Sequence, residues 1–150
     1  MNVEARIEKF VNMPRAQLEG EARKCFFKYA NAVHRKALRS GWSQEKYNSA
    51  IVLLPSLIAV ADGHYYAMEN SFWESIFATG EMVSLLRQEA NYILNGDGEL
   101  SRIIQTQVLF DYLTPGELEA ACEFSVCYLL CFGSITPKAR RLLDNLFSNV

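Results

Sequence analysis

The stretch AIVLLPSLIAVADGHYYAMENSFW, residues 50–73, decides how this chain folds. Its first half is apolar on every side, which predicts a helix buried in the middle of the protein. The apolar run ends at Asp62 and Gly63, and glycine is the residue that most often ends a helix in the left-handed conformation. An amphipathic pattern follows over residues 67–77. The stretch therefore predicts two antiparallel helices joined by a short corner at Gly63.

The rest of the chain also shows the helical period, and no segment alternates at the period of two that a strand would need. Pro55 lies inside the apolar helix and predicts a kink or break near Leu54. The dipeptide Thr-Pro opens two further helices, because threonine is a good N-cap and proline suits the first helical position. The sequence predicts an all-α fold, a compact bundle of seven or eight helices. The expected helices cover residues 21–39, 43–61, 67–77, 81–94 and 100–113, and two segments that begin at Thr114 and Thr136.

Two expected helices show which face should be buried. In residues 21–39 an apolar stripe includes Phe26, Tyr29 and Val33, which recur at intervals of three and four. In residues 100–113 the apolar spacing comes from Ile103, Ile104, Gln107 and Val108, so this face is expected to pack on the core.

Residues 55–77 match residues 125–147 at an offset of 70 positions. Each copy has an apolar helix, a glycine, a short loop and an amphipathic helix. Gly63 corresponds to Gly133, and two positions later Tyr65 corresponds to Ile135, which we expect to fill the corner between the helices. The match predicts two related helix-turn-helix halves. Further matched positions pair Phe72 with Leu142, Trp73 with Leu143, Ile76 with Leu146, and Phe77 with Phe147.

The length of 150 residues fits a single helical domain with a sizeable core. This organisation assigns four parts to residues 1–150: an N-terminal amphipathic arm at 1–40, a first repeat half at 44–80, connecting helices at 81–113, and a second repeat half at 114–150.

The charged residues are unevenly distributed along the chain. Residues 1–48 hold ten Lys or Arg and five Asp or Glu, whereas residues 49–135 hold two and eleven. The basic segment is therefore expected to dock on the acidic remainder, or else to attract a partner protein. The acidic region at 62–123 is the other surface that could bind such a partner.

A basic stripe, Lys24, Lys28, Arg35 and Arg39, lies opposite the apolar stripe of residues 21–39. Its position predicts a solvated helix face, with a docking strip for an anionic protein partner as the alternative. No aromatic residues are interleaved with these cations, so nucleic acid is not expected as a partner. Tyr66 is the aromatic residue that we expect to be exposed for a partner.

The beginning of the chain has no apolar segment of the kind that a secretory signal needs. The longest apolar stretch, Ala50 to Ala61, is shorter than the roughly 20 residues of a membrane-spanning helix. We therefore expect no membrane span, a cytoplasmic location and reduced cysteines. Of Cys122, Cys127 and Cys131, only the last two share a helix face, so the three sulfurs are not expected to bind one zinc ion. Together with Cys25 they are predicted to be small core residues.

The first corner, ADGHYYAMENSFW, resembles the motif of the tellurite-resistance TerB-like family of helical domains, with Asp62, Gly63 and Glu69 in register. The second corner, CFGSITPKARRLL, is similar to a degenerate copy, with Phe132 and Ala139 where the family has acids. The resemblance covers about residues 50–147. It implies a metal-associated stress-response module with no established catalytic reaction.

If the acids of this family bind metal, the first corner keeps Asp62 and Glu69, with Asn70 as a further oxygen donor. A hard cation such as calcium needs six to eight oxygen ligands, so two carboxylates would hold a divalent cation only weakly. The alternative is that Asp62 caps the loop or the next helix, and that Glu69 favours the positive end of that helix. The expected cofactor is therefore none, or a weakly bound divalent cation.

No nucleophile elbow, phosphate-binding loop or dinucleotide-binding glycine pattern occurs in the sequence, so an enzyme is not expected. The favoured function is a non-enzymatic, TerB-like interaction or stress-response module that acts through protein–protein contacts. The alternatives are a weak divalent-metal-binding protein and a small antagonist of one host or phage protein. A homo-oligomer is also compatible with the sequence.

Overall fold

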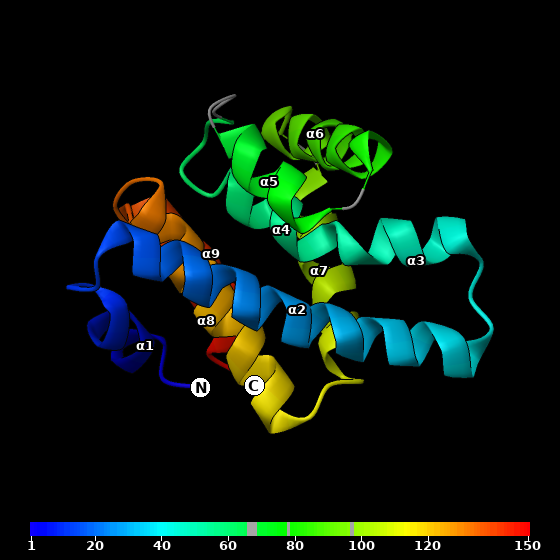
Figure 1. Ribbon diagram of the computed structural model, residues 1–150, viewed down its shortest axis with the longest axis horizontal. Coiled ribbons are helices and arrows are strands. Elements are labelled where there is room, and N and C mark those ends of the chain that lie inside the picture. Colours follow the sequence, from blue (N-terminus) through cyan, green and yellow to red (C-terminus); the bar gives the residue numbers. More distant parts are fainter. Residues whose placement is uncertain (66–68, 78, 97) are drawn as a thin grey trace.

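The computed structural model describes residues 1–65, 69–77, 79–96 and 98–150. Over these residues the chain forms helices and no strand, which confirms the all-α prediction (Figure 1). Only Val52 separates α3 from α4, so the described residues form eight helices when these two are counted as one broken rod. The helices are α1 (Val3–Phe10), α2 (Arg15–Ser40), α3 (Gln44–Ile51), α4 (Leu53–Ala59), α5 (Asn70–Ile76), α6 (Gly80–Leu94), α7 (Gly98–Phe110), α8 (Pro115–Cys131) and α9 (Pro137–Phe147).

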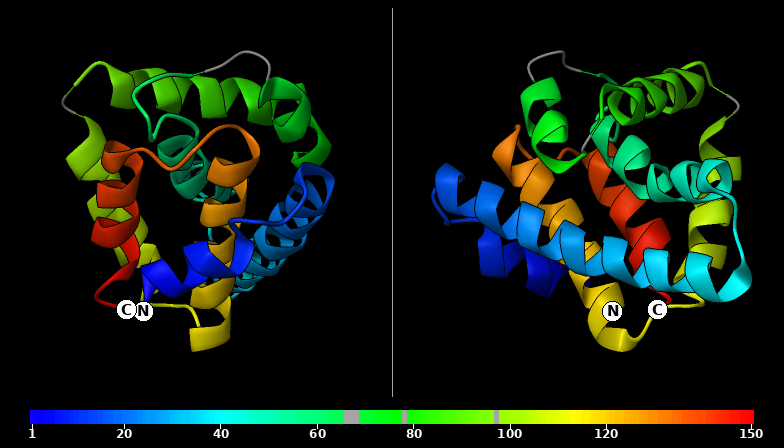
Figure 2. Two further views of the ribbon diagram at one scale, coloured as in Figure 1. Left: turned by 90° about the vertical axis from the view of Figure 1, so that its left-hand side faces the viewer. Right: turned by 45° about the vertical axis from the view of Figure 1, so that its right-hand side comes forward.

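Helix α8 forms the centre of the molecule. Every residue from Ala120 to Leu129 is buried, and α1, α2, α4 and α9 all pack against this helix. The left view of Figure 2 shows α8 between α2 and α9, with the two chain ends close together. Its first turn is fixed locally: Thr114 and Glu117 form a reciprocal capping box around Pro115. The helix start predicted at Thr114 is therefore confirmed.

The predicted break in the apolar helix is confirmed and lies at Val52. Pro55 has no backbone N–H to donate to the carbonyl of Ile51, and its ring would clash with that carbonyl in a continuous helix. Helix α3 therefore ends at Ile51, and all seven residues of α4 are buried.

Both predicted glycine corners turn with positive backbone angles. Gly63, after α4, has φ 97°, and Gly133, after α8, has φ 156°. Tyr65 and Ile135 are partly buried and pack against the core, as expected for residues that fill a corner. The two halves still differ, because α8 is continuous whereas its counterpart is broken. That the two halves are related helix-turn-helix units stays a prediction.

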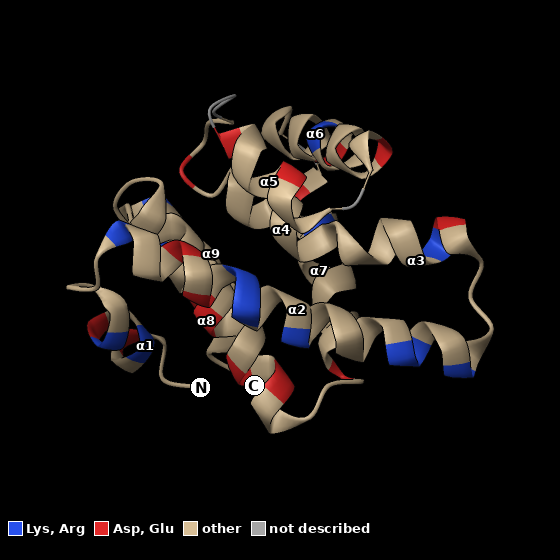
Figure 3. Ribbon diagram, in the orientation of Figure 1, with Lys and Arg blue, Asp and Glu red and all other residues tan. Residues whose placement is uncertain are grey.

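The basic N-terminal segment packs against the acidic face of α8 within the same chain. Figure 3 shows acidic residues of α8 beside Lys and Arg residues of α1 and α2. Arg6 lies 3.0 Å from Glu119 and 3.3 Å from Glu123, and Lys9 lies 2.8 Å from Glu123. These pairs show that the basic segment docks on the acidic part of the same chain, and attraction of a partner protein stays a prediction. Helix α1 itself was not expected, and α2 begins six residues earlier than predicted.

The prediction of which face of α7 is buried is wrong in part. Ile103 is buried as predicted, but Ile104 and Val108 are exposed, and Thr106 is buried instead. The Thr106 hydroxyl donates a hydrogen bond of 2.8 Å to the carbonyl of Arg102. The hydroxyl proton of Thr106 therefore keeps a hydrogen-bond partner when the side chain is buried. The face of α7 formed by Ile103, Thr106 and Phe110 can thus pack in the core.

All four cysteines are free and buried, as predicted for core residues. Burial raises the pKa of Cys25 to about 11 and that of Cys122 to about 12, so these thiols stay protonated at neutral pH. In the part of the chain that the structure describes, no helix combines the length and the apolar character needed to cross a membrane.

Candidate functional site

The two carboxylates predicted from the first corner meet at one small cavity. Asp62 and Glu69 line it together with Tyr128 at the end of α8 and Gly133 and Ser134 of the second corner. Its volume of about 20 Å³ is enough for about one water molecule. The structure therefore brings the two corners together, although their glycines lie 70 positions apart.

Glu69 is the most unusual acid of this cavity, because only 3% of its surface is exposed. Its carboxylate accepts a hydrogen bond from the hydroxyl of Tyr128. Burial raises the pKa of Glu69 to about 7, which the charge of Asp62 also favours and the hydrogen bond from Tyr128 opposes. Glu69 occupies the N-cap position of α5, but its side chain makes no capping hydrogen bond there. The carboxyl is directed to Tyr128 instead.

Asp62 caps the loop that follows it, as the alternative to a metal site predicted. Its carboxylate accepts a hydrogen bond of 3.1 Å from the backbone N–H of His64. This local turn is typical of aspartate before a glycine corner.

The cation predicted at this corner would find few ligands. Over the described residues, no group of three or more His, Cys, Asp and Glu side chains is placed to hold a metal ion. The side-chain oxygen of Asn70 accepts a hydrogen bond from the hydroxyl of Tyr65. Asp62 and Glu69 would therefore have to be supplemented by loop carbonyls and water.

The basic stripe is exposed, and three of its four members lie beside acids of the same chain. Arg35 forms an ion pair with Glu117 at the start of α8. Lys24 and Lys28 line a cleft of about 440 Å³ whose lining also includes Glu21, Glu119 and Glu123. Arg39 lies in the last turn of α2, where a cation is favoured by the helix dipole. Tyr66 lies outside the described residues.

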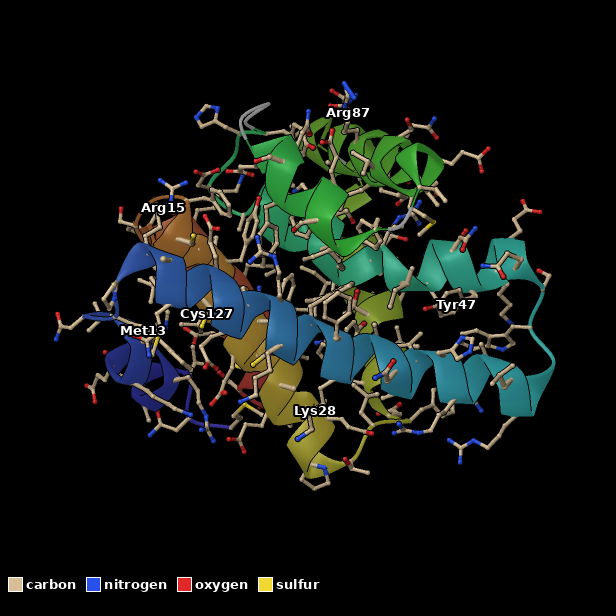
Figure 4. The ribbon with its side chains drawn as sticks, viewed as in Figure 1. Met13, Arg15, Lys28, Tyr47, Arg87 and Cys127 are labelled. Carbon is tan, nitrogen blue, oxygen red and sulfur yellow. The ribbon has the colours of Figure 1, made fainter. Side chains whose placement is uncertain are left out.

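A groove that the sequence analysis missed runs between α2, α3 and the start of α6. Its central part has a volume of about 520 Å³, in the range of ligand-binding pockets. Figure 4 shows Tyr47 of α3 on the side that faces α2. Among the described lining residues Glu81 alone is charged. The apolar lining is Phe26, Phe27, Ala30, Tyr47, Ile51, Ile76, Phe77 and Met82, and the polar lining is Asn31, Gln44, Asn48 and Thr79.

The groove continues into two further hollows that share residues with its central part. Toward the α2–α3 turn, a hollow of about 160 Å³ shares Gln44 and Tyr47 with it and adds Leu38 and Trp42. Toward α6, a shallow hollow of about 650 Å³ shares Asn48, Glu81 and Met82 with it. We call the three parts together the α2–α3 groove.

The groove stays open because α3 contributes little to the core. Of its eight residues, all of them described, only Ile51 is buried. Phe27 of α2 points away from the core and is 44% exposed, whereas its neighbour Phe26 is buried. The polar composition of residues 44–50 was the one available signal that α3 leaves apolar residues of α2 uncovered.

No family model matches this chain, and no curated protein or solved structure matches it. The resemblance drawn from the two corner motifs therefore stands on those residues alone.

Proposed function

We propose that this protein is a non-enzymatic interaction module that binds an amphipathic helix of a partner protein in the α2–α3 groove. The observation that carries the proposal is the groove itself, whose lining is mainly apolar and includes the amide side chains of Asn31, Gln44 and Asn48. An amphipathic helix binds such a groove through apolar anchors at intervals of three and four residues. A TerB-like stress-response module and an antagonist of one protein would both use a surface of this kind.

The shape of the groove favours a peptide over a small molecule. Small-molecule pockets bury most of the ligand surface, whereas this groove is open and continues into two further hollows. Helix α3 alone is about 12 Å long at 1.5 Å per residue, which matches about two turns of a bound helix. The charge of Glu81 favours a basic residue at that end of the bound helix.

Substitution of Phe27 by aspartate tests the proposal. Helical peptides of about 14 residues, selected from a displayed library against the wild-type protein, are expected to bind Phe27→Asp at least about tenfold more weakly. The reason is that the substitution removes an exposed aromatic anchor and places an unpaired carboxylate against the apolar face of the peptide. Fluorescence anisotropy with the labelled peptide measures the dissociation constant.

The matched control is Leu100→Asp, which changes an exposed apolar residue of α7 outside the groove and is expected to leave peptide binding unchanged. A second test is the charge reversal Glu81→Lys, which is expected to weaken the binding of peptides that carry a basic residue at that end. Selected peptides that bind the Phe27→Asp protein with unchanged affinity would contradict the proposal.

A divalent cation at Asp62 and Glu69 is the second candidate, favoured by the placement of both carboxylates at one cavity. Because the pKa of Glu69 is raised to about 7, a cation competes with a proton, and binding is expected above pH 7. Calorimetric titration with calcium, zinc and manganese is expected to give heat with the wild-type protein and none with Asp62→Ala. Absence of heat for all three cations with the wild type would exclude this site.

A further inference from the structure

A second apolar surface lies on α7, and none of its residues lines the α2–α3 groove. Leu100, Ile104 and Val108 are 68%, 51% and 53% exposed, and they follow one another at intervals of four residues. Residues spaced in this way form one ridge along a helix. We call these three residues the α7 ridge. Tyr112, 47% exposed, lies a further four residues along the chain, just after the helix ends.

The middle of the α7 ridge is surrounded by uncharged residues, whereas Glu99 precedes Leu100 and Asp111 follows Phe110 at its two ends. No charged residue occurs from Ile103 to Phe110, and the ridge is flanked by Ser101, Gln105 and Gln107. The nearest cation on the helix, Arg102, is bound within the chain: its Nε lies 2.6 Å from Glu89, and its guanidinium stacks over the ring of Tyr92. The centre of this face therefore presents no charge to a partner.

An uncharged, regularly spaced ridge suits contact with an identical ridge. A twofold axis brings the same residues of two copies together, so charges near the axis would repel one another. Ile104 is equally far along the helix from Leu100 and from Val108. In an antiparallel pair, Ile104 would meet its own copy while Leu100 of one chain meets Val108 of the other.

We propose that the α7 ridge is the contact between two copies of this chain, related by a twofold axis beside Ile104. This inference uses a different face from the proposed peptide groove and does not depend on it. The core residues of α8 are buried within one chain, so the monomer needs no partner to cover its core. The pair is therefore a reversible dimer of folded monomers.

The size of the ridge sets how tightly the two copies bind. Helix α7 has 13 residues and is about 20 Å long, so its outer face offers less than the ~800 Å² per partner of a standard stable interface. With an interface of that size, we expect a monomer–dimer equilibrium that shifts with protein concentration in the micromolar range, rather than a permanent dimer.

Sedimentation velocity tests the dimer. Between about 5 and about 500 µM, the average mass of the wild-type protein is expected to rise from 17.0 kDa toward twice that value. Ile104→Glu is expected to weaken association by at least about tenfold, because two carboxylates would meet at the axis. Leu38→Glu is the matched control: Leu38 is 69% exposed on α2, close to the value for Leu100, and its substitution is expected to leave the mass unchanged.

Cross-linking gives a second measurement that does not depend on the strength of the interface. The four native cysteines are buried, so Ile104→Cys adds the one exposed thiol. Under mild oxidation this variant is expected to form a covalent dimer much faster than Leu38→Cys, because a disulfide needs Cα atoms within about 7 Å. A wild-type mass of 17.0 kDa at every concentration, or equal cross-linking of the two cysteine variants, would overturn the dimer. Neither result would affect the peptide groove, because Ile104→Glu is expected to bind peptide normally.

Discussion

Substitution of Glu69 by glutamine is expected to stabilise the folded protein above pH 7 by up to about 3 kcal/mol and to leave it nearly unchanged near pH 4.5. The amide has almost the shape of the protonated carboxyl, and its oxygen can accept the hydrogen bond from Tyr128. It cannot ionise, so it never places a negative charge in the buried site.

The direction of this effect follows from the two pKa values of Glu69. In the folded protein burial raises the pKa to about 7, whereas the unfolded chain has the ordinary value of 4.5. The folded state therefore binds more protons between these values, and the free energy of unfolding falls as the pH rises from 4.5 to 7. The contribution of Glu69 to stability is fully present below pH 4.5 and is lost above pH 7.

Urea unfolding of the wild type and of Glu69→Gln from pH 4.5 to pH 8.5 measures the difference. The control is Glu74→Gln, since Glu74 is an exposed acid on the same helix and its substitution is expected to leave the pH dependence parallel to that of the wild type. A constant difference between the wild type and Glu69→Gln at every pH would show that Glu69 titrates alike in both states.

The helix ends could be predicted from the sequence because local chemistry decides them. Thr114 and Glu117 form their capping box with neighbouring residues, and Pro55 prevents a continuous helix whatever packs around it. Gly41 ends α2 with a φ of 64°, in the left-handed conformation that glycine adopts most readily. None of these signals depends on a distant part of the chain.

The buried face of α7 could not be predicted because the sequence holds two overlapping apolar stripes. One stripe contains Ile103 and Phe110, and the other contains Leu100, Ile104 and Val108. Both have the helical period, and only the positions of the neighbouring helices decide which one is covered. The same limit applies to Phe26 and Phe27, adjacent residues of which one is buried and the other borders the α2–α3 groove.

The residues of the candidate carboxylate site could be predicted from the sequence, but the raised pKa of Glu69 could not. Asp62 and Glu69 flank one corner, so their proximity follows from the chain itself. The burial of Glu69 depends on Tyr128, which lies 59 residues later and reaches the corner only because α8 packs beside it. A raised pKa therefore depends on tertiary structure, which the spacing of the motif does not contain.

Removal of both cations beside Glu123 is expected to destabilise the protein by about 3 kcal/mol, near the lower bound for unpairing a buried charge. The Glu123 side chain is only 10% exposed, and Arg6 and Lys9 both lie within 3.3 Å of its carboxylate. The double variant Arg6→Met/Lys9→Met keeps the apolar stems of both side chains, so the loss reports the unpaired charge rather than lost packing.

The thermodynamic cycle with Glu123→Gln separates this charge effect from every other consequence of the substitutions. In the Glu123→Gln background no buried carboxylate is left unpaired, so the same double variant is expected to cost less than about 1 kcal/mol. Arg15→Met is the control for an exposed cation, because Arg15 lies 3.6 Å from Glu19 with 64% of its side chain exposed. Urea unfolding measures all four proteins of the cycle. An equal cost of the double variant in both backgrounds would contradict the view that buried charge pairing holds α1 against α8.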